Sequence, residues 1–123
     1  MATWDDVERL ATALPSVQEG TTWGNRCWKV AGKTFAWVRP LGTKDRADLG
    51  DAVPTGEVMA VRVDGEGSKA ELLAAEPDVC FTIPHFDGYA AVLVRLVDVD
   101  EDLLDELVHD AWRVRAPKRL LDD

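Results

Sequence analysis

The sequence has no long hydrophobic run and little cysteine. No stretch reaches the ~18–20 apolar residues that a membrane-spanning helix needs, and residues Met1 to Asp6 lack the basic and apolar regions of a secretory signal. The two cysteines, Cys27 and Cys80, lie in apolar strand-like runs, with no C-x-x-C spacing and no histidine at ligand spacing. We therefore expect a cytosolic protein with buried thiols, no membrane partner and no zinc site.

The composition is that of one ordinary globular domain. The chain has 123 residues, of which 46% are hydrophobic and 30% charged, and these values exclude collagen, coiled-coil and disordered classes. A chain of this length buries about two-thirds of its surface on folding, so no metal or disulfide is needed to stabilise it. We expect a single domain that spans residues 1–123.

Negative charge is absent from two segments of an otherwise acidic chain. Fourteen Lys and Arg residues stand against 23 Asp and Glu, for a net charge of −9, which argues against casual binding to nucleic acid. Residues 20–44, however, contain five basic residues and no acid, and residues 111–121 contain four basic residues and no acid. If the two segments meet in the fold, they create one electropositive surface.

The N-terminal part predicts one helix followed by a hairpin. Thr3 and Asp6 form a variant capping box, and apolar residues recur at helical spacing up to Leu14, before Pro15. Aromatic and β-branched runs then predict two strands joined by a tight turn, at residues 26–30 and 34–39. The stretch from Pro40 to Gly56 has no periodicity, so we expect a long loop there.

The remaining sequence predicts three further strands and two helices. The strand patterns occupy residues 58–63, 80–83 and 90–97. Ser68 and Glu71 form a capping box that predicts the start of a short helix. The last helix begins at Asp98 or Asp100, has a negatively charged first turn, and runs to about Ala116.

This order of elements predicts the fold class. Two terminal helices with apolar stripes enclose a set of strands that short turns connect, which favours an antiparallel sheet. We expect an α+β two-layer sandwich, with a sheet of about five strands and the N- and C-terminal helices packed on one face.

Several short motifs resemble one bacterial family. They are His85 to Tyr89, Val92 to Leu96, Ala111 to Arg113 and Ala116 to Leu120, with further matches at residues 14–15, 19–21 and 32–36. Over nearly its whole length the chain resembles the MmcQ/YjbR-like family. That resemblance implies a frataxin-like (CyaY-like) fold and carries the customary label of a DNA-binding protein. It brings no catalytic residues and no cofactor.

The first candidate site is a nucleic-acid surface built from the hairpin and the C-terminal tail. Its cations are Arg26, Lys29, Lys33, Arg113, Arg115, Lys118 and Arg119. They interleave with Trp23, Trp28, Phe35 and Trp37, the mixture of rings and cations that single-strand binders use. Two structural interpretations stay open: strand alternation places some of the rings in the core, and Arg113 and Arg115 complement the negative end of a helix dipole.

The second candidate is a pocket for a small anionic ligand, formed by His85, Asp87 and Trp112. A histidine in the turn after Pro84 is suited to act as an acid, a base or an anion contact near neutral pH. The alternative is a histidine that fixes its own turn. Because no nucleophile with a base and an orienting group can be assembled, we expect a binding domain rather than an enzyme.

A metal site receives little support from the sequence. Glu106 and His109 form one Glu-x-x-His pair, whereas carboxylate-bridged sites need that pair twice, with two further acids from facing helices. We therefore expect the acidic face of the last helix to be solvated and to hold no metal.

Overall fold

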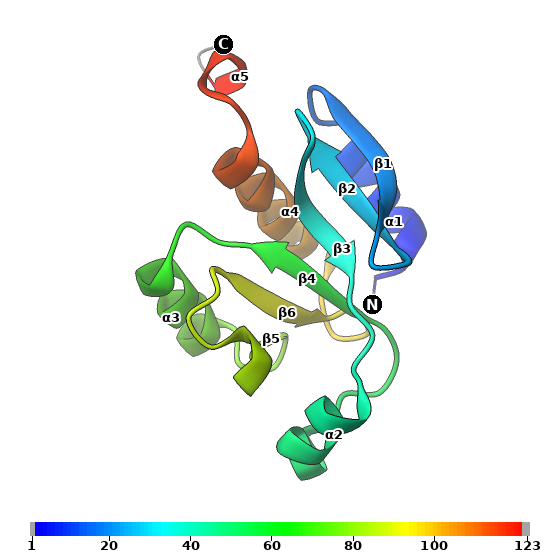
Figure 1. Ribbon diagram of the computed structural model, residues 1–123, viewed down its shortest axis with the longest axis vertical. Coiled ribbons are helices and arrows are strands. Elements are labelled where there is room, and N and C mark those ends of the chain that lie inside the picture. Colours follow the sequence, from blue (N-terminus) through cyan, green and yellow to red (C-terminus); the bar gives the residue numbers. More distant parts are fainter. Residues whose placement is uncertain (1, 122–123) are drawn as a thin grey trace.

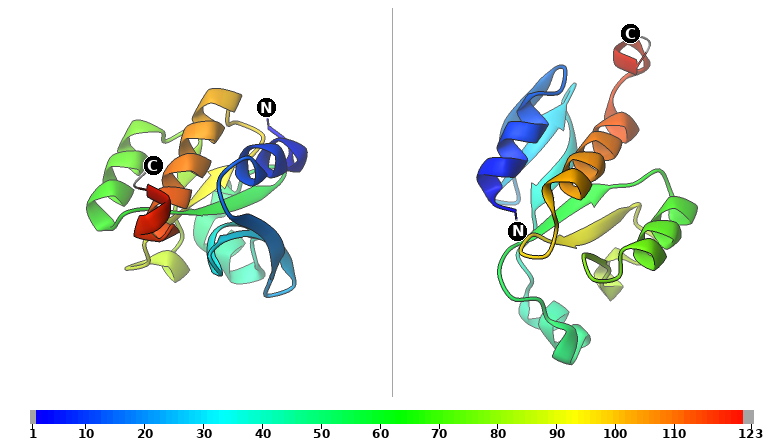
Figure 2. Two further views of the ribbon diagram at one scale, coloured as in Figure 1. Left: turned by 90° about the horizontal axis from the view of Figure 1, so that it is seen from above. Right: turned by 180° about the vertical axis from the view of Figure 1, so that it is seen from behind.

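Two helices, α1 (Trp4–Thr12) and α4 (Glu101–Arg115), pack against the same face of one antiparallel sheet. The computed structural model describes residues 2–121. The view from behind in Figure 2 shows both helices lying over the sheet, while Figure 1 shows the opposite face of the sheet toward the viewer. The predicted α+β class, the antiparallel sheet and the shared helical face are confirmed.

The sheet has six strands rather than about five. Their order is β1-β2-β3-β4-β6-β5, and all neighbours are antiparallel. The strands are β1 (Val17–Thr22), β2 (Asn25–Val30), β3 (Lys33–Val38), β4 (Val58–Arg62), β5 (Cys80–Phe81) and β6 (Ala91–Arg95). The additional strand is β1, an edge strand that pairs with β2 along its whole length.

The helices α1 and α4 begin at the N-cap residues that the sequence predicts, Thr3 and Asp100. The Thr3 side chain accepts a hydrogen bond from the Asp6 amide, and the Asp6 side chain accepts one from the Thr3 amide, so the capping box is present. The Asp100 side chain accepts from the Leu103 amide at 2.8 Å and begins α4. Local capping chemistry thus fixes where each helix starts.

Two local predictions were wrong, and one element was not predicted. The expected loop Pro40 to Gly56 contains the helix α2 (Thr43–Leu49) and the short 3-10 helix η1 (Gly50–Ala52), and Asp45 caps α2 by accepting from the Gly42 amide. The helix α3 (Glu66–Ala75) begins after Gly65, so Ser68 lies inside it and caps nothing. The tail adds one short helix, α5 (Lys118–Leu121), after Pro117.

The two faces of the sheet carry separate apolar clusters. The larger cluster lies under α1 and α4 and includes Trp28, Phe35 and Met59. The smaller cluster, on the other face, includes Trp37, and α2 and the 3-10 helix η2 (Pro84–Phe86) cover part of it. Near β2 and β3 this second face is open. In the described part of the chain no helix has the length and apolarity to cross a bilayer.

Candidate functional site: a cationic cleft on the open sheet face

A cleft of about 1030 Å³ lies on the open face of the sheet. It extends from the turn between β1 and β2, across β3, to the segment that follows β5. Its lining combines aromatic rings with cations, and none of the described residues that line it is Asp or Glu. The aromatic lining residues are Trp23, Trp37, His85, Phe86 and Tyr89.

Four cations line the cleft: Lys33, Arg39, Arg62 and Arg115. Lys33 and Arg39 come from the first segment without acids, and Arg115 comes from the second. Both segments therefore contribute cations to the cleft, where the end of α4 comes close to β3. A low-dielectric wall with one sign of charge raises the local concentration of anions.

The cations of the cleft differ in how they are paired. Arg39 lies 3.3 Å from the carboxylate of Asp45 and over the ring of Phe86. In contrast, no carboxylate of residues 2–121 lies within ion-pair distance of Lys33, Arg62 or Arg115. These three side chains keep their full charge available to a ligand.

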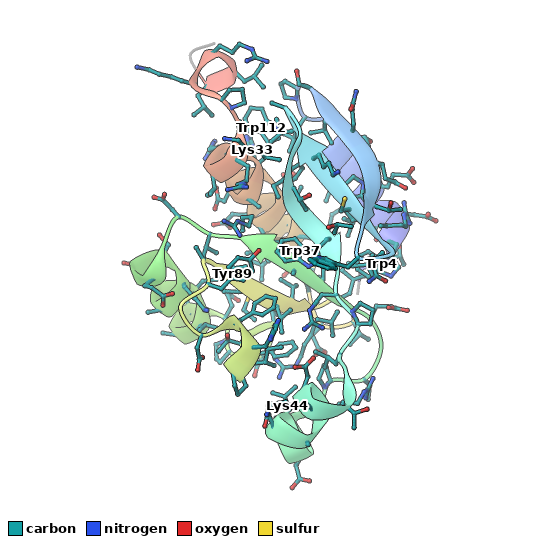
Figure 3. The ribbon with its side chains drawn as sticks, viewed as in Figure 1. Trp4, Lys33, Trp37, Lys44, Tyr89 and Trp112 are labelled. Atoms are coloured by element: carbon teal, nitrogen blue, oxygen red, sulfur yellow. The ribbon has the colours of Figure 1, made fainter. Side chains whose placement is uncertain are left out.

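Arg62 and Tyr89 lie against each other in the cleft wall. The guanidinium carbon of Arg62 lies 4.8 Å from the centre of the Tyr89 ring, and the Tyr89 ring lies 6.4 Å from Trp37 and edge-on to Phe86 at 5.3 Å. Figure 3 shows Trp37 and Tyr89 together on the open face of the sheet. Rings and a stacked guanidinium in this arrangement offer π faces beside positive charge.

Buried guanidinium donors in the cleft wall are unused. The Nε atoms of Arg62 and Arg115 are buried and have no hydrogen-bond partner among the described residues. Buried polar groups in folded proteins are nearly always hydrogen-bonded, so such donors call for an explanation. Both side chains are half-buried and line the cleft, so an anion there could accept from their terminal guanidinium N–H groups, which are not buried.

Lys69 fixes the segment that carries His85, Phe86 and Tyr89. This lysine is only 5% exposed, and its Nζ donates to the carbonyl oxygens of Phe86 at 2.7 Å and Tyr89 at 2.9 Å. A buried ammonium group needs such partners, since an unpaired charge in the interior is very costly. Helix α3 thus holds one wall of the cleft in place.

The structure separates Arg26 and Arg113 from the other predicted cations. Arg26 lies over Trp28 and is paired with Glu19 at 2.8 Å, with Glu8 at 3.8 Å. The hydrogen bond from Arg26 lowers the pKa of the Glu19 carboxyl. Arg113 is exposed and paired with Asp110. Neither arginine lines the cleft, and each has its charge balanced by a neighbouring carboxylate.

Apart from Arg115, which lines the cleft, four predicted cations remain. Lys33 lines it, as described above, and Lys29 is half-buried beside Gly20, with Thr34 of the cleft as its pairing partner. Lys118 and Arg119 are exposed on α5, just beyond Arg115, and are not among the lining residues. Only part of the predicted cationic surface is therefore brought together.

The predicted pocket residues are not brought together. His85 is exposed and lines the cleft, 6.2 Å from the Phe86 ring. Asp87 is exposed and its amide ends η2 by bonding to the Pro84 carbonyl. Trp112 belongs to the core under α4, where its indole N–H donates to the Pro15 carbonyl at 3.0 Å. The expected grouping of Trp112 with His85 is thus corrected by the fold.

Sequence reasoning missed Arg62 and Lys69 as site residues. Arg62 is a lone cation at the end of an apolar strand, and its position in the cleft depends on the pairing of β4 with β3 and β6. Lys69 resembles any surface lysine of a short helix, and no sequence signal marks it as buried. Among residues 2–121 no three His, Cys, Asp or Glu side chains gather to hold a metal ion.

Comparison with known proteins identifies the family of this chain. Residues 12–114 match the YjbR family. The chain belongs to this family. The uncharacterised proteins Rv2570 of Mycobacterium tuberculosis and Mb2600 of Mycobacterium bovis are each 48% identical over 124 residues, which cover 98% of this chain and 94% of theirs. The resemblance to the YjbR family read from the sequence motifs is confirmed.

A solved structure shares the YjbR-family fold. It is the crystal structure of the Deinococcus radiodurans protein DR2400, whose domain is described as DUF419. The TM-score is 0.66 and the identity 23%, over 91% of this chain and 77% of the other. At that identity the likeness shows the shared architecture and carries no information about ligands.

Proposed function

We propose that this YjbR-family protein is a binding domain for single-stranded nucleic acid, and that the strand lies in the cationic cleft. The observation that carries the proposal is the lining itself: four cations and five aromatic rings, with no carboxylate among the described lining residues. A single strand presents phosphates to cations and unpaired bases to rings, so this combination suits it.

The arrangement favours a single strand over a duplex. Readers of duplex DNA commonly place a helix with basic residues in the major groove. Here the exposed face of α4 carries Asp102, Asp105 and Glu106, which would repel phosphates. The ring of Tyr89, in contrast, is 40% exposed and lines the cleft, where an unstacked base could reach it, and the buried ring of Trp37 lies 6.4 Å away.

The number of cations sets the expected salt dependence. If the three cleft cations without a carboxylate partner each neutralise one phosphate, the slope of log K against log salt is about −2.1, and affinity falls about 18-fold between 50 and 200 mM salt. Because the whole chain carries a net charge of −9, binding also requires that the strand stay within the cleft.

The test is a fluorescence-polarisation titration of a labelled oligothymidine of about 10 nucleotides, at 50 mM salt. The variants Arg62→Gln and Arg115→Gln should bind more weakly, and each should lower the salt slope by about 0.7. The matched control is Arg113→Gln, which removes an exposed arginine already paired with Asp110. Equal affinities for the wild type and both cleft variants would refute the proposal.

A second candidate is a small anionic ligand, such as a free nucleotide, bound beside His85. The cleft volume of about 1030 Å³ lies close to the usual range of small-molecule sites. Competition separates the two candidates. A free nucleotide that displaces the oligonucleotide at micromolar concentration favours the small ligand, whereas displacement only by longer strands favours the single strand.

A further inference from the structure

Trp23 is the most exposed large hydrophobic side chain among the described residues, at 94%. It lies in the two-residue turn between β1 and β2, at the edge of the cleft, and is one of the lining residues. An indole this exposed buries almost none of its apolar surface, so it contributes little to folding.

The backbone at Trp23 is unfavourable for a bulky residue. Trp23 has φ of +53° and Gly24 has φ of +80°, the positive values that a type I′ hairpin turn requires at both central positions. Asn, Asp and Gly adopt this conformation readily, whereas a large side chain at positive φ is an outlier that costs free energy.

A second turn in the same sheet shows that the geometry does not call for an indole. The turn between β2 and β3 consists of Ala31 and Gly32, with φ of +50° and +80°. It connects two strands with the same two-residue loop as Trp23 and Gly24 do. The sheet therefore builds this turn with a methyl group at the first position, and the indole of Trp23 serves no need of the turn.

We infer that Trp23 is a base-stacking residue of the cleft, held in solvent by a strained turn so that an unpaired base can stack on its ring. The inference rests on the proposed function, because it takes the single strand as the ligand. Its position is suited to the role: Lys33, Arg62 and Arg115 line the same cleft and can neutralise the phosphates beside a base stacked at its edge. Stacking on one aromatic side chain is worth about 5- to 150-fold in affinity.

Three variants test the inference. Trp23→Asn should raise the melting temperature by about 2–5 °C, since asparagine suits the turn, and should weaken oligothymidine binding about 5- to 150-fold. Trp23→Phe keeps a ring and should bind within a few-fold of the wild type. The control Ala31→Asn should also raise the melting temperature but leave affinity unchanged.

Intrinsic fluorescence reports the contact directly. Of the five tryptophans, Trp28, Trp37 and Trp112 are buried and Trp4 is half-buried, so the red-shifted emission belongs to Trp23. Oligothymidine should quench that emission in the wild type and not in Trp23→Phe. If the wild type binds tightly and Trp23→Asn binds with the same affinity, the inference is wrong and the proposed function stands. The same conclusion holds whether the melting temperature of Trp23→Asn rises or falls. No wild-type binding at 20 mM salt overturns the proposed function and the inference together.

Discussion

The ammonium group of Lys69 on α3 lies 2.9 Å from the backbone carbonyl oxygen of Tyr89, across a turn that also carries His85. A second bond, to the Phe86 carbonyl at 2.7 Å, completes the contact. One buried lysine thus connects the helix α3 to the wall of the cleft. The position of the Tyr89 ring beside Arg62 depends on this connection.

Lys69→Met should lower the free energy of unfolding by about 2 kcal/mol, because two carbonyl oxygens lose their donor in or near the interior. Urea unfolding measures the change. The matched control is Lys44→Met, at an exposed lysine paired with Asp48, for which the loss should stay below about 0.5 kcal/mol. Equal effects of the two changes would contradict the structural role of Lys69.

Cys80 should give the protein a stability that falls in alkaline solution. Burial raises the pKa of its thiol from 9.0 to about 12, so the folded state keeps the proton while the unfolded state loses it. The thiol's contribution is fully present below pH 9 and disappears between pH 9 and 12. At pH 10 the wild type should lose about 1.4 kcal/mol relative to pH 7.

The variant Cys80→Ala isolates that effect. It lowers stability at every pH by removing buried volume, but the additional loss between pH 8 and pH 10 should be smaller than in the wild type. Urea unfolding at both pH values measures the difference. A parallel decline of the two proteins would show that Cys80 does not titrate as its burial requires.

Trp112→Phe should reduce stability and leave ligand binding unchanged. The change removes the hydrogen bond to the Pro15 carbonyl and part of a buried ring, at a cost of about 1–3 kcal/mol. Thermal unfolding and the oligothymidine titration measure the two quantities. Weaker oligothymidine binding with unchanged stability would contradict this prediction and show that Trp112 contributes to ligand binding.

Arg26→Gln should affect Glu19 rather than the cleft. The arginine lowers the pKa of the Glu19 carboxyl, mainly through a hydrogen bond, so its removal should return that pKa toward the ordinary value for glutamate. An NMR titration of the side-chain carboxyl measures the shift. Oligothymidine affinity should match that of the wild type, and a clear loss of affinity would place Arg26 in the binding surface.

The sequence predicted those parts of the fold that local chemistry determines. Thr3 and Asp100 begin helices because their side chains cap them, and Pro15 and Pro117 lie shortly beyond the ends of α1 and α4. The strand β1 (Val17–Thr22) was not predicted, because apolar and polar residues alternate only weakly along it. It lies at the edge of the sheet, where pairing with β2 rather than burial stabilises it. The helix α2 was not predicted, because the residue before it is Gly42, which has no capping side chain. The cap is instead the Asp45 side chain, inside the helix, which accepts from the Gly42 amide.

The candidate site was predictable only in part, for a similar reason. The absence of acids from residues 20–44 and 111–121 is visible in the sequence, and Lys33 and Arg115 do meet at the cleft. Strand alternation does not show which cations form ion pairs with neighbouring carboxylates. Arg26 and Glu19 come together only because β1 pairs with β2. Arg62 enters the site through sheet pairing between residues distant in sequence.

The location of the ligand is tested most directly by NMR, with amide and indole N–H signals recorded while unlabelled oligothymidine is added at low salt. We expect shift changes concentrated on the cleft, at Trp23, Lys33, Trp37, Arg62 and Tyr89, and little change on the exposed face of α4. Changes confined to the exposed face of α4, or none at all at millimolar oligonucleotide, would contradict it.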